Sequence, residues 1–207
     1  MRNYSSRDMA RIGCHDCKGC SKCCCNMGQS IVLNPYDVYL MSEHMGLSFV
    51  ELLAGPLELS SEAGIVHPNL RMIDSLAGPR CGFLDADSRC SIHAFRPGIC
   101  RLFPLGRDYA DGTISYFVLE EACPAQGKTK EKIASWLGFS SDAALKRYES
   151  FLLDWHLFIK GKREEIYASG EMAQAVAKEI SAKILDTFYI KPYERFYEEV
   201  AERMLKG

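Results

Sequence analysis

The sequence predicts a mostly helical α+β protein with a loop-rich cysteine-cluster core, short strands and a helical C-terminal segment. All ten cysteines of the 207-residue chain lie at or before Cys123. Residues 57–80 contain two glycines and two prolines, which favour loops and brief strands. After residue 128, apolar side chains recur at spacings of three and four, which is typical of amphipathic helices. We therefore expect a core over residues 1–127 and a helical segment over residues 128–207 that packs on it.

The chain is expected to begin with a loose arm and to continue into a capped helix. Residues 1–13 are polar and mixed in charge, which predicts the arm. The apolar residues 31–33 are a strand candidate. Asn34 is a suitable helix cap and a proline follows it, so we expect a helix that stops at Gly46.

A second helix and a later strand follow from local signals. Ser48 and Glu51 stand at the spacing of a capping box, and the helix that they open should end at Gly55, which a proline follows. Residues 113–120 are rich in β-branched and aromatic side chains, which predicts a strand.

The C-terminal part is predicted to be helical throughout. The apolar stripes cover residues 129–137, 142–160, 171–189 and 192–205. Methionine and aromatic residues at these spacings are usually core residues, and we interpret them in this way.

Residues 14–25 read C-H-D-C-K-G-C-S-K-C-C-C, so six of twelve positions are cysteine. Thiolates are soft ligands, and several of them converging on one point select zinc, copper(I) or an iron–sulfur cluster. The alternative is a set of disulfides. Adjacent cysteines cannot easily bridge one another, and residues 1–20 lack the apolar stretch of a secretion signal. The sequence therefore favours a metal or cluster site.

Two spacings within this run are compatible with such a site. Cys14, Cys17, Cys20 and Cys24 fit C-x2-C-x2-C-x3-C, which bacterial ferredoxins use for iron–sulfur clusters. Cys17, Cys20, Cys23 and Cys24 fit C-x2-C-x2-C-C instead. Because adjacent cysteines in a strand or turn point in different directions, Cys23 and Cys24 are expected to serve different sites, or one of them stays free. One filled site and two filled sites are both compatible with ten cysteines.

The overall composition excludes some classes of protein. Charged residues make up 25% of the chain and the net charge is −2, whereas nucleic-acid binders usually show a basic excess. No apolar run approaches the ~20 residues that cross a bilayer. We expect a reduced cytoplasmic protein without a nucleic-acid or membrane partner.

The motifs C-K-G-C-S-K-C-C, I-V-L-N-P-Y-D, C-G-F-L, C-S-I-H and R-P-G-I-C-R-L-F-P together resemble the YkgJ-type cysteine-cluster family. That family is described as a zinc- or iron-chelating domain, and the flagellin lysine methylases (FliB-like proteins) are similar to it. The resemblance covers about residues 17–124. It implies that the metal-binding cysteines are Cys17, Cys20, Cys23, Cys24, Cys81, Cys90, Cys100 and Cys123.

Some residues depart from the family pattern or add to it. Cys14 and Cys25 lie outside the family frame and are expected to be dispensable for metal binding. His93 stands where the family commonly has tyrosine; it is either an additional nitrogen ligand or a hydrogen-bonded loop histidine. Arg96 and Arg101 bracket a cysteine and are candidate cofactor-binding residues. Their guanidinium groups can neutralise a thiolate cluster or hold a substrate carboxylate, or else they pair with Asp85, Asp87 or Glu120.

The resemblance implies two functions of different kinds. The first is an iron–sulfur protein, with a [4Fe–4S] cluster, that takes part in S-adenosylmethionine-linked methyl transfer to a protein substrate or in redox chemistry with a partner. A short chain without a G-x-G nucleotide loop argues against the methyl-transfer form. The second is a non-enzymatic zinc- or iron-binding module for metal handling or protein interaction. The sequence does not name the substrate.

Overall fold

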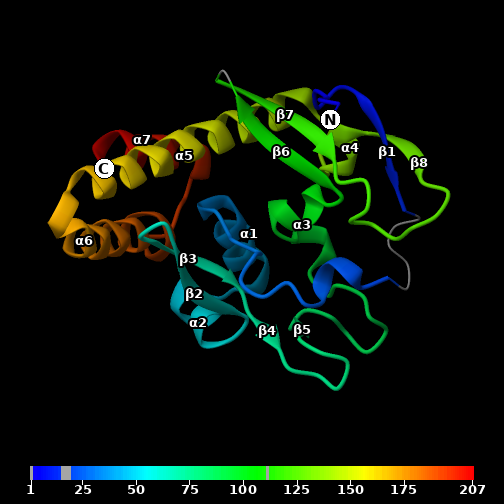
Figure 1. Ribbon diagram of the computed structural model, residues 1–207, viewed down its shortest axis with the longest axis horizontal. Coiled ribbons are helices and arrows are strands. Elements are labelled where there is room, and N and C mark those ends of the chain that lie inside the picture. The colour runs from blue at the N-terminus through cyan, green and yellow to red at the C-terminus, as the bar shows by residue number, and fades with distance from the viewer. Residues whose placement is uncertain (1, 15–19, 111) are drawn as a thin grey trace. The chain divides into compact units, whose positions relative to one another are not determined.

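The structure is a computed structural model that describes residues 2–14, 20–110 and 112–207. It confirms the mostly helical α+β class, because the described residues form seven α-helices and short strands paired in two-stranded sheets (Figure 1). The chain divides into two compact units. Unit 1 consists of Met1–Met27 and Met72–Leu153, and unit 2 of Gly28–Arg71 and Asp154–Gly207. The nine cysteines that the structure describes all belong to unit 1.

Unit 1 contains three antiparallel strand pairs. Strand β1 (Met9–Gly13) pairs with β8 (Thr129–Lys132), and β6 (Leu105–Ala110) pairs with β7 (Thr113–Val118). The third pair is short and joins β4 (Met72–Ile73) to β5 (Arg80–Cys81). Strand β7 agrees with the strand predicted over residues 113–120.

Two predictions about unit 1 are wrong, and one strand pair explains both. The N-terminal arm is not loose, because residues 9–13 form β1 and bury the alternating side chains of Ala10 and Ile12. Residues 129–137 are not one helix, because Thr129–Lys132 pairs with β1 and only α4 (Ile133–Trp136) is helical. The apolar alternation in β1 spans just two buried positions, which is too short to stand out from its polar neighbours.

The buried face of β1 gives a direct stability test. The side chain of Ile12 is fully buried in the core of unit 1, whereas Met9 on the same strand is 54% exposed. We expect Ile12→Ala to lower the free energy of unfolding by about 2–5 kcal/mol, because it leaves a cavity in a packed core. Met9→Ala should change it by no more than about 0.5 kcal/mol. Chemical denaturation measures both, and equal losses would show that β1 does not contribute to the core.

The helices of unit 1 surround the same core. Helix α3 (Gly98–Leu102) follows the 3-10 turn η3 (His93–Phe95), and a second 3-10 turn, η2 (Lys22–Cys24), lies in the cysteine run. Residues 142–153 of the long helix α5 (Asp142–Ala168) also belong to unit 1. There, the Tyr116 hydroxyl donates a 2.8 Å hydrogen bond to Glu149. Side chains from β1, β7, α4 and α5 therefore build one core.

Unit 2 begins with the two capped helices that the sequence predicts. In α1 (Pro35–Met45), the Asn34 side chain accepts from the Asp37 N–H at 3.0 Å, and the left-handed Gly46 ends the helix at φ 66°. In α2 (Phe49–Ala54), Ser48 and Glu51 form the expected capping box. Residues 31–33 are not a strand, since only Val32 makes a single bridge to the hairpin that follows α2.

The rest of unit 2 is a hairpin covered by the C-terminal helices. Strands β2 (Leu57–Glu62) and β3 (Ile65–Leu70) pair, and α6 (Ala173–Leu185) packs on β3, where the Val66 N–H donates to the Ser181 hydroxyl at 3.0 Å. A π-helical turn, Asp186–Ile190, and α7 (Phe196–Lys206) follow. The helices end within a few residues of their predicted limits, except that α5 continues to residue 168.

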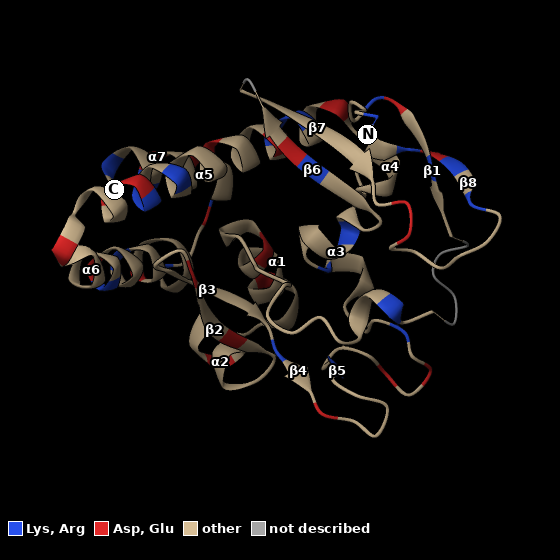
Figure 2. Ribbon diagram, viewed as in Figure 1, with Lys and Arg blue, Asp and Glu red and all other residues tan. Residues whose placement is uncertain are grey.

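Both units have mixed surfaces. Acidic and basic residues are interspersed over the elements (Figure 2), in line with a net charge of −2. No helix among the described residues is long and apolar enough to cross a bilayer. The expected division into a cysteine-cluster core over residues 1–127 and a helical segment over residues 128–207 that packs on it stays a prediction.

Candidate metal centre

The cysteine run enters the site through a tight turn. The Cys24 N–H donates to the Ser21 carbonyl at 2.8 Å and closes η2, so the sulfur atoms of Cys23 and Cys24 lie 3.9 Å apart. This differs from the expectation that adjacent cysteines point apart, because a 3-10 turn does not have the alternation of a strand. The two sulfur atoms are therefore close enough to serve one site.

The next residues join this turn to the second cysteine stretch. Cys25 is extended and forms an antiparallel bridge with Arg80, and the Asn26 N–H donates to the Pro79 carbonyl at 2.8 Å. The neighbour of Arg80 in β5 is Cys81. Backbone pairing thus brings two segments together that are more than fifty residues apart in sequence.

Cys81 and Cys90 begin turns of the same construction. The Cys81 carbonyl accepts from the Leu84 N–H at 3.1 Å, and the Cys90 carbonyl accepts from the His93 N–H at 3.2 Å. In each turn the backbone N–H two residues after the cysteine, that of Phe83 or Ile92, lowers the pKa of the thiol, against the larger effect of burial, which raises it. An N–H directed at sulfur stabilises a thiolate, and the sequence analysis did not identify these two donors.

A bridge between Leu84 and Cys90 fixes the two turns side by side. Between them, the Asp85 side chain accepts from the N–H groups of Asp87 and Arg89 at 2.9 and 2.8 Å, which gives Asp85 a role in the turn. The sequence signal for this arrangement is the repeat of C-G-F-L and C-S-I-H, two cysteines each followed by three residues that complete a turn.

Six cysteines from both stretches interact electrostatically with at least one other cysteine of the group. Burial raises the pKa of Cys81, and the charges of Cys90, Cys23 and Cys25 raise it further. The hydrogen bond with Cys23 and burial raise the pKa of Cys24, and the charges of Cys81 and Cys100 add to this. The cysteines that act on one another in this way, here called the thiol cluster, are Cys23, Cys24, Cys25, Cys81, Cys90 and Cys100.

The pair Cys23–Cys24 is the most polarised part of the thiol cluster. The hydrogen bond between the two thiols lowers the pKa of Cys23 to about 6, while burial opposes this shift and the Arg96 charge assists it. The same hydrogen bond raises the pKa of Cys24. The contact between the two thiols therefore favours a thiolate at Cys23.

The other predicted cysteines have separate surroundings. Cys20 is exposed and Cys123 is buried, and neither is among the six residues that define the thiol cluster. Cys14 is half-buried and directly follows β1. Cys17 lies outside the described residues. The structure therefore brings together five of the eight family cysteines and adds Cys25.

The donor set of the thiol cluster fits a metal held by thiolates. Within the described residues, no three His, Cys, Asp or Glu side chains already stand where they could hold a metal ion. For the sulfur atoms of the thiol cluster to move together around a metal ion they must be deprotonated, and a cation promotes this deprotonation as it binds. Soft thiols in a partly buried group with N–H donors directed at them supply the ligands and the stabilisation that such a site needs.

The two arginines that bracket Cys100 in sequence have different contacts. The Arg96 guanidinium donates to the His93 ring at 2.9 Å, which matches the hydrogen-bonded alternative for His93. The Arg101 guanidinium lies 5.9 Å from the ring centres of Phe139 and Tyr148. In the described part of the chain, neither arginine forms an ion pair with an aspartate or a glutamate.

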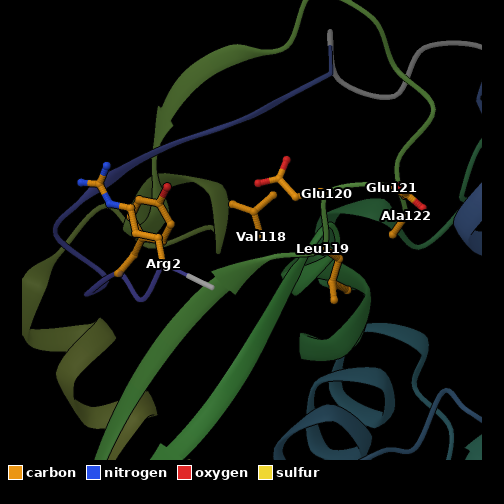
Figure 3. A pocket seen from close by; sticks show the side chains of 7 residues that line it. Arg2, Val118, Leu119, Glu120, Glu121 and Ala122 are labelled. Atoms are coloured by element: carbon orange, nitrogen blue, oxygen red, sulfur yellow. The ribbon is translucent and has the colours of Figure 1, made fainter.

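An open cavity of about 600 Å³ lies beside the segment that leads to Cys123 (Figure 3). Arg2, which lies 4.8 Å from the Tyr4 ring centre, contributes a guanidinium, and Glu120 and Glu121 contribute carboxylates. Tyr4 is held there by two 2.8 Å backbone hydrogen bonds with Tyr116. The sequence does not predict this cavity, because its N-terminal residues have the polar composition of a loose arm.

Comparison with known proteins supports metal chemistry. Residues 16–124, more than half of the chain, match a family model described as "CxxCxxCC: Putative zinc- or iron-chelating domain". This match includes the whole thiol cluster and Cys123. No curated protein and no solved structure matches the chain.

Proposed function

The chain belongs to the CxxCxxCC family, and on this premise we propose that unit 1 holds an iron–sulfur cluster of the [4Fe–4S] type through cysteine thiolates. The family description supports zinc or iron chelation. The observation that carries the finer proposal is the thiol cluster, in which two turns of equal construction present Cys81 and Cys90 beside the Cys23–Cys24 pair.

The cysteine spacing favours an iron–sulfur cluster over zinc. Both centres take four cysteine thiolates, but Cys14, Cys17, Cys20 and Cys24 stand at the C-x2-C-x2-C-x3-C spacing that bacterial ferredoxins use. An iron–sulfur cluster is also held by thiolates, and hydrogen bonds to its sulfur ligands and burial adjust its potential. The backbone N–H groups of Phe83 and Ile92, which lower the pKa of Cys81 and Cys90, are the candidate donors.

The bound cluster would supply one-electron chemistry, and the chain's own residues would hold and insulate it. Cys81 is buried, and the other cysteines of the thiol cluster are half-buried, so water has limited access to the ligands. We propose a redox role with a protein partner, because that role needs no further substrate site.

Metal and sulfide analysis after anaerobic purification tests this proposal. The expected result is a brown protein with iron and acid-labile sulfide in equal amounts, and with absorption that bleaches in air. A colourless protein with stoichiometric zinc would instead support the alternative, a non-enzymatic zinc module for metal handling or protein interaction.

S-adenosylmethionine-linked methyl transfer to a protein is a second candidate, and the cavity beside Cys123 favours it. The guanidinium of Arg2 and the carboxylates of Glu120 and Glu121 complement the carboxylate and ammonium groups of S-adenosylmethionine. Calorimetric titration of S-adenosylmethionine into the loaded protein, compared with Glu120→Gln, tests this role. The absence of binding to the unmodified protein would contradict it.

A further inference from the structure

The segment between Cys90 and Cys100 places an arginine beside the thiol cluster. The turn that begins at Cys90 continues into η3, where the Phe95 N–H donates to the Ile92 carbonyl at 3.0 Å. Arg96 follows η3 in an extended conformation with ψ 150°, and α3 with Cys100 comes next. Arg96 is thus attached to two cysteines of the cluster by short, hydrogen-bonded turns.

The Arg96 side chain is held in one orientation by His93. Because a guanidinium can only donate, the 2.9 Å contact makes His93 Nε2 the acceptor and places the ring proton on Nδ1. The His93 backbone is fixed in turn by its hydrogen bond to the Cys90 carbonyl. His93 therefore links Arg96 to the turn that presents Cys90.

The Arg96 charge acts on cysteines from both stretches. The hydrogen bond to His93, whose own N–H donates to the Cys90 carbonyl, holds Arg96 near Cys90, and its charge also acts on Cys23. A metal bound by several thiolates carries net negative charge in a partly buried site. A guanidinium beside it offsets that charge without competing as a ligand.

Arg101 lies just beyond Cys100 in sequence but has different contacts. Its guanidinium lies 5.9 Å from the ring centres of both Phe139 and Tyr148, and within the described residues its buried Nη2 has no hydrogen-bond partner. These are packing and cation–π contacts within unit 1.

We propose that Arg96 is the charge-compensating residue of the thiolate site, that His93 is the residue that positions it, and that Arg101 is a packing residue. The inference rests on the proposed thiolate metal site. Within the R-P-G-I-C-R motif, the first arginine thus stabilises the bound metal and the second stabilises the fold.

Titration with Co²⁺ tests this division, because thiolate-to-cobalt absorption reports binding without any assay of activity. The full-length protein is prepared metal-free and reduced. We expect Arg96→Gln to weaken Co²⁺ affinity about tenfold or more, as the loss of outer-shell partners does. Arg96→Lys, which keeps the charge, should recover part of the affinity. The matched control Arg101→Gln should keep the affinity and lower the melting temperature.

A second pair of variants examines the role of His93. His93→Phe removes the acceptor and should weaken Co²⁺ affinity in the same direction as Arg96→Gln. His93→Gln retains an acceptor and should restore affinity. If Arg96→Gln does not fold, the Co²⁺ affinities of Arg96→Lys and His93→Phe still test whether Arg96 and His93 support metal binding.

The proposed metal site and the proposed roles of the two arginines are contradicted by different results. An unmodified protein that shows no thiolate-to-cobalt absorption would contradict the proposed metal site itself. Unchanged affinity in Arg96→Gln, or an equal loss in Arg101→Gln, would overturn the division of roles while the metal site stands. Equal Co²⁺ affinities of His93→Phe and His93→Gln would show that His93 does not position Arg96.

Discussion

Replacing Cys81 with serine is expected to lower bound metal at least tenfold after purification. Cys81 is 6% exposed and follows Arg80 in β5, which bridges Cys25 of the first cysteine stretch. A hydroxyl is a harder and less acidic ligand than a thiol, and outer-shell changes alone cost about 10–100-fold in metal affinity. Metal content per chain, measured by mass spectrometry, gives the result.

Cys25→Ser is the matched control for this experiment. Cys25 belongs to the same run and to the thiol cluster, but it lies outside the family frame and its sulfur atom has a contact with the Ser21 hydroxyl at 3.9 Å. We expect this variant to keep its metal. Lost metal in Cys25→Ser, or retained metal in Cys81→Ser, would overturn the assignment of ligands.

Removal of the metal is expected to lower the melting temperature by about 8–16 °C. Between Cys81 and Cys100, the buried apolar side chains are those of Leu84, Ile92 and Pro97, so these turns have little core of their own. A ligand present at 1,000 times its dissociation constant stabilises a protein by about 4 kcal/mol, and for a chain of this size each kcal/mol corresponds to roughly 2–4 °C.

Calorimetry before and after treatment with a chelator measures this shift. The Cys81→Ser protein is the control, because a protein that has already lost its metal should not respond to the chelator. A chelated protein that kept its original melting temperature would show that the metal has no structural role.

The helix caps and the cysteine motifs could be predicted because each is a local signal. Asn34 and Gly46 bound α1 as expected, since capping depends on residues within one or two turns. The strand β1 could not be predicted, because its stability comes from a partner more than one hundred residues away. Pairing of this kind leaves almost no trace in the five residues of the strand.

The candidate metal centre divides in the same way. The cysteines themselves are visible in the sequence, and the family resemblance selects eight of them. Their grouping is not visible, because it depends on the bridge between Cys25 and Arg80 and on backbone N–H groups that carry no side-chain signature. The different contacts of Arg96 and Arg101 are likewise a consequence of the turns around them.

X-ray absorption of the metal in the purified protein tests the central claim most directly, because it measures the ligands of the metal that the protein holds. The account predicts a first shell of sulfur alone at about 2.3 Å, the distance typical of metal–thiolate bonds. A first shell of nitrogen or oxygen at about 2.0–2.2 Å would contradict a thiolate site.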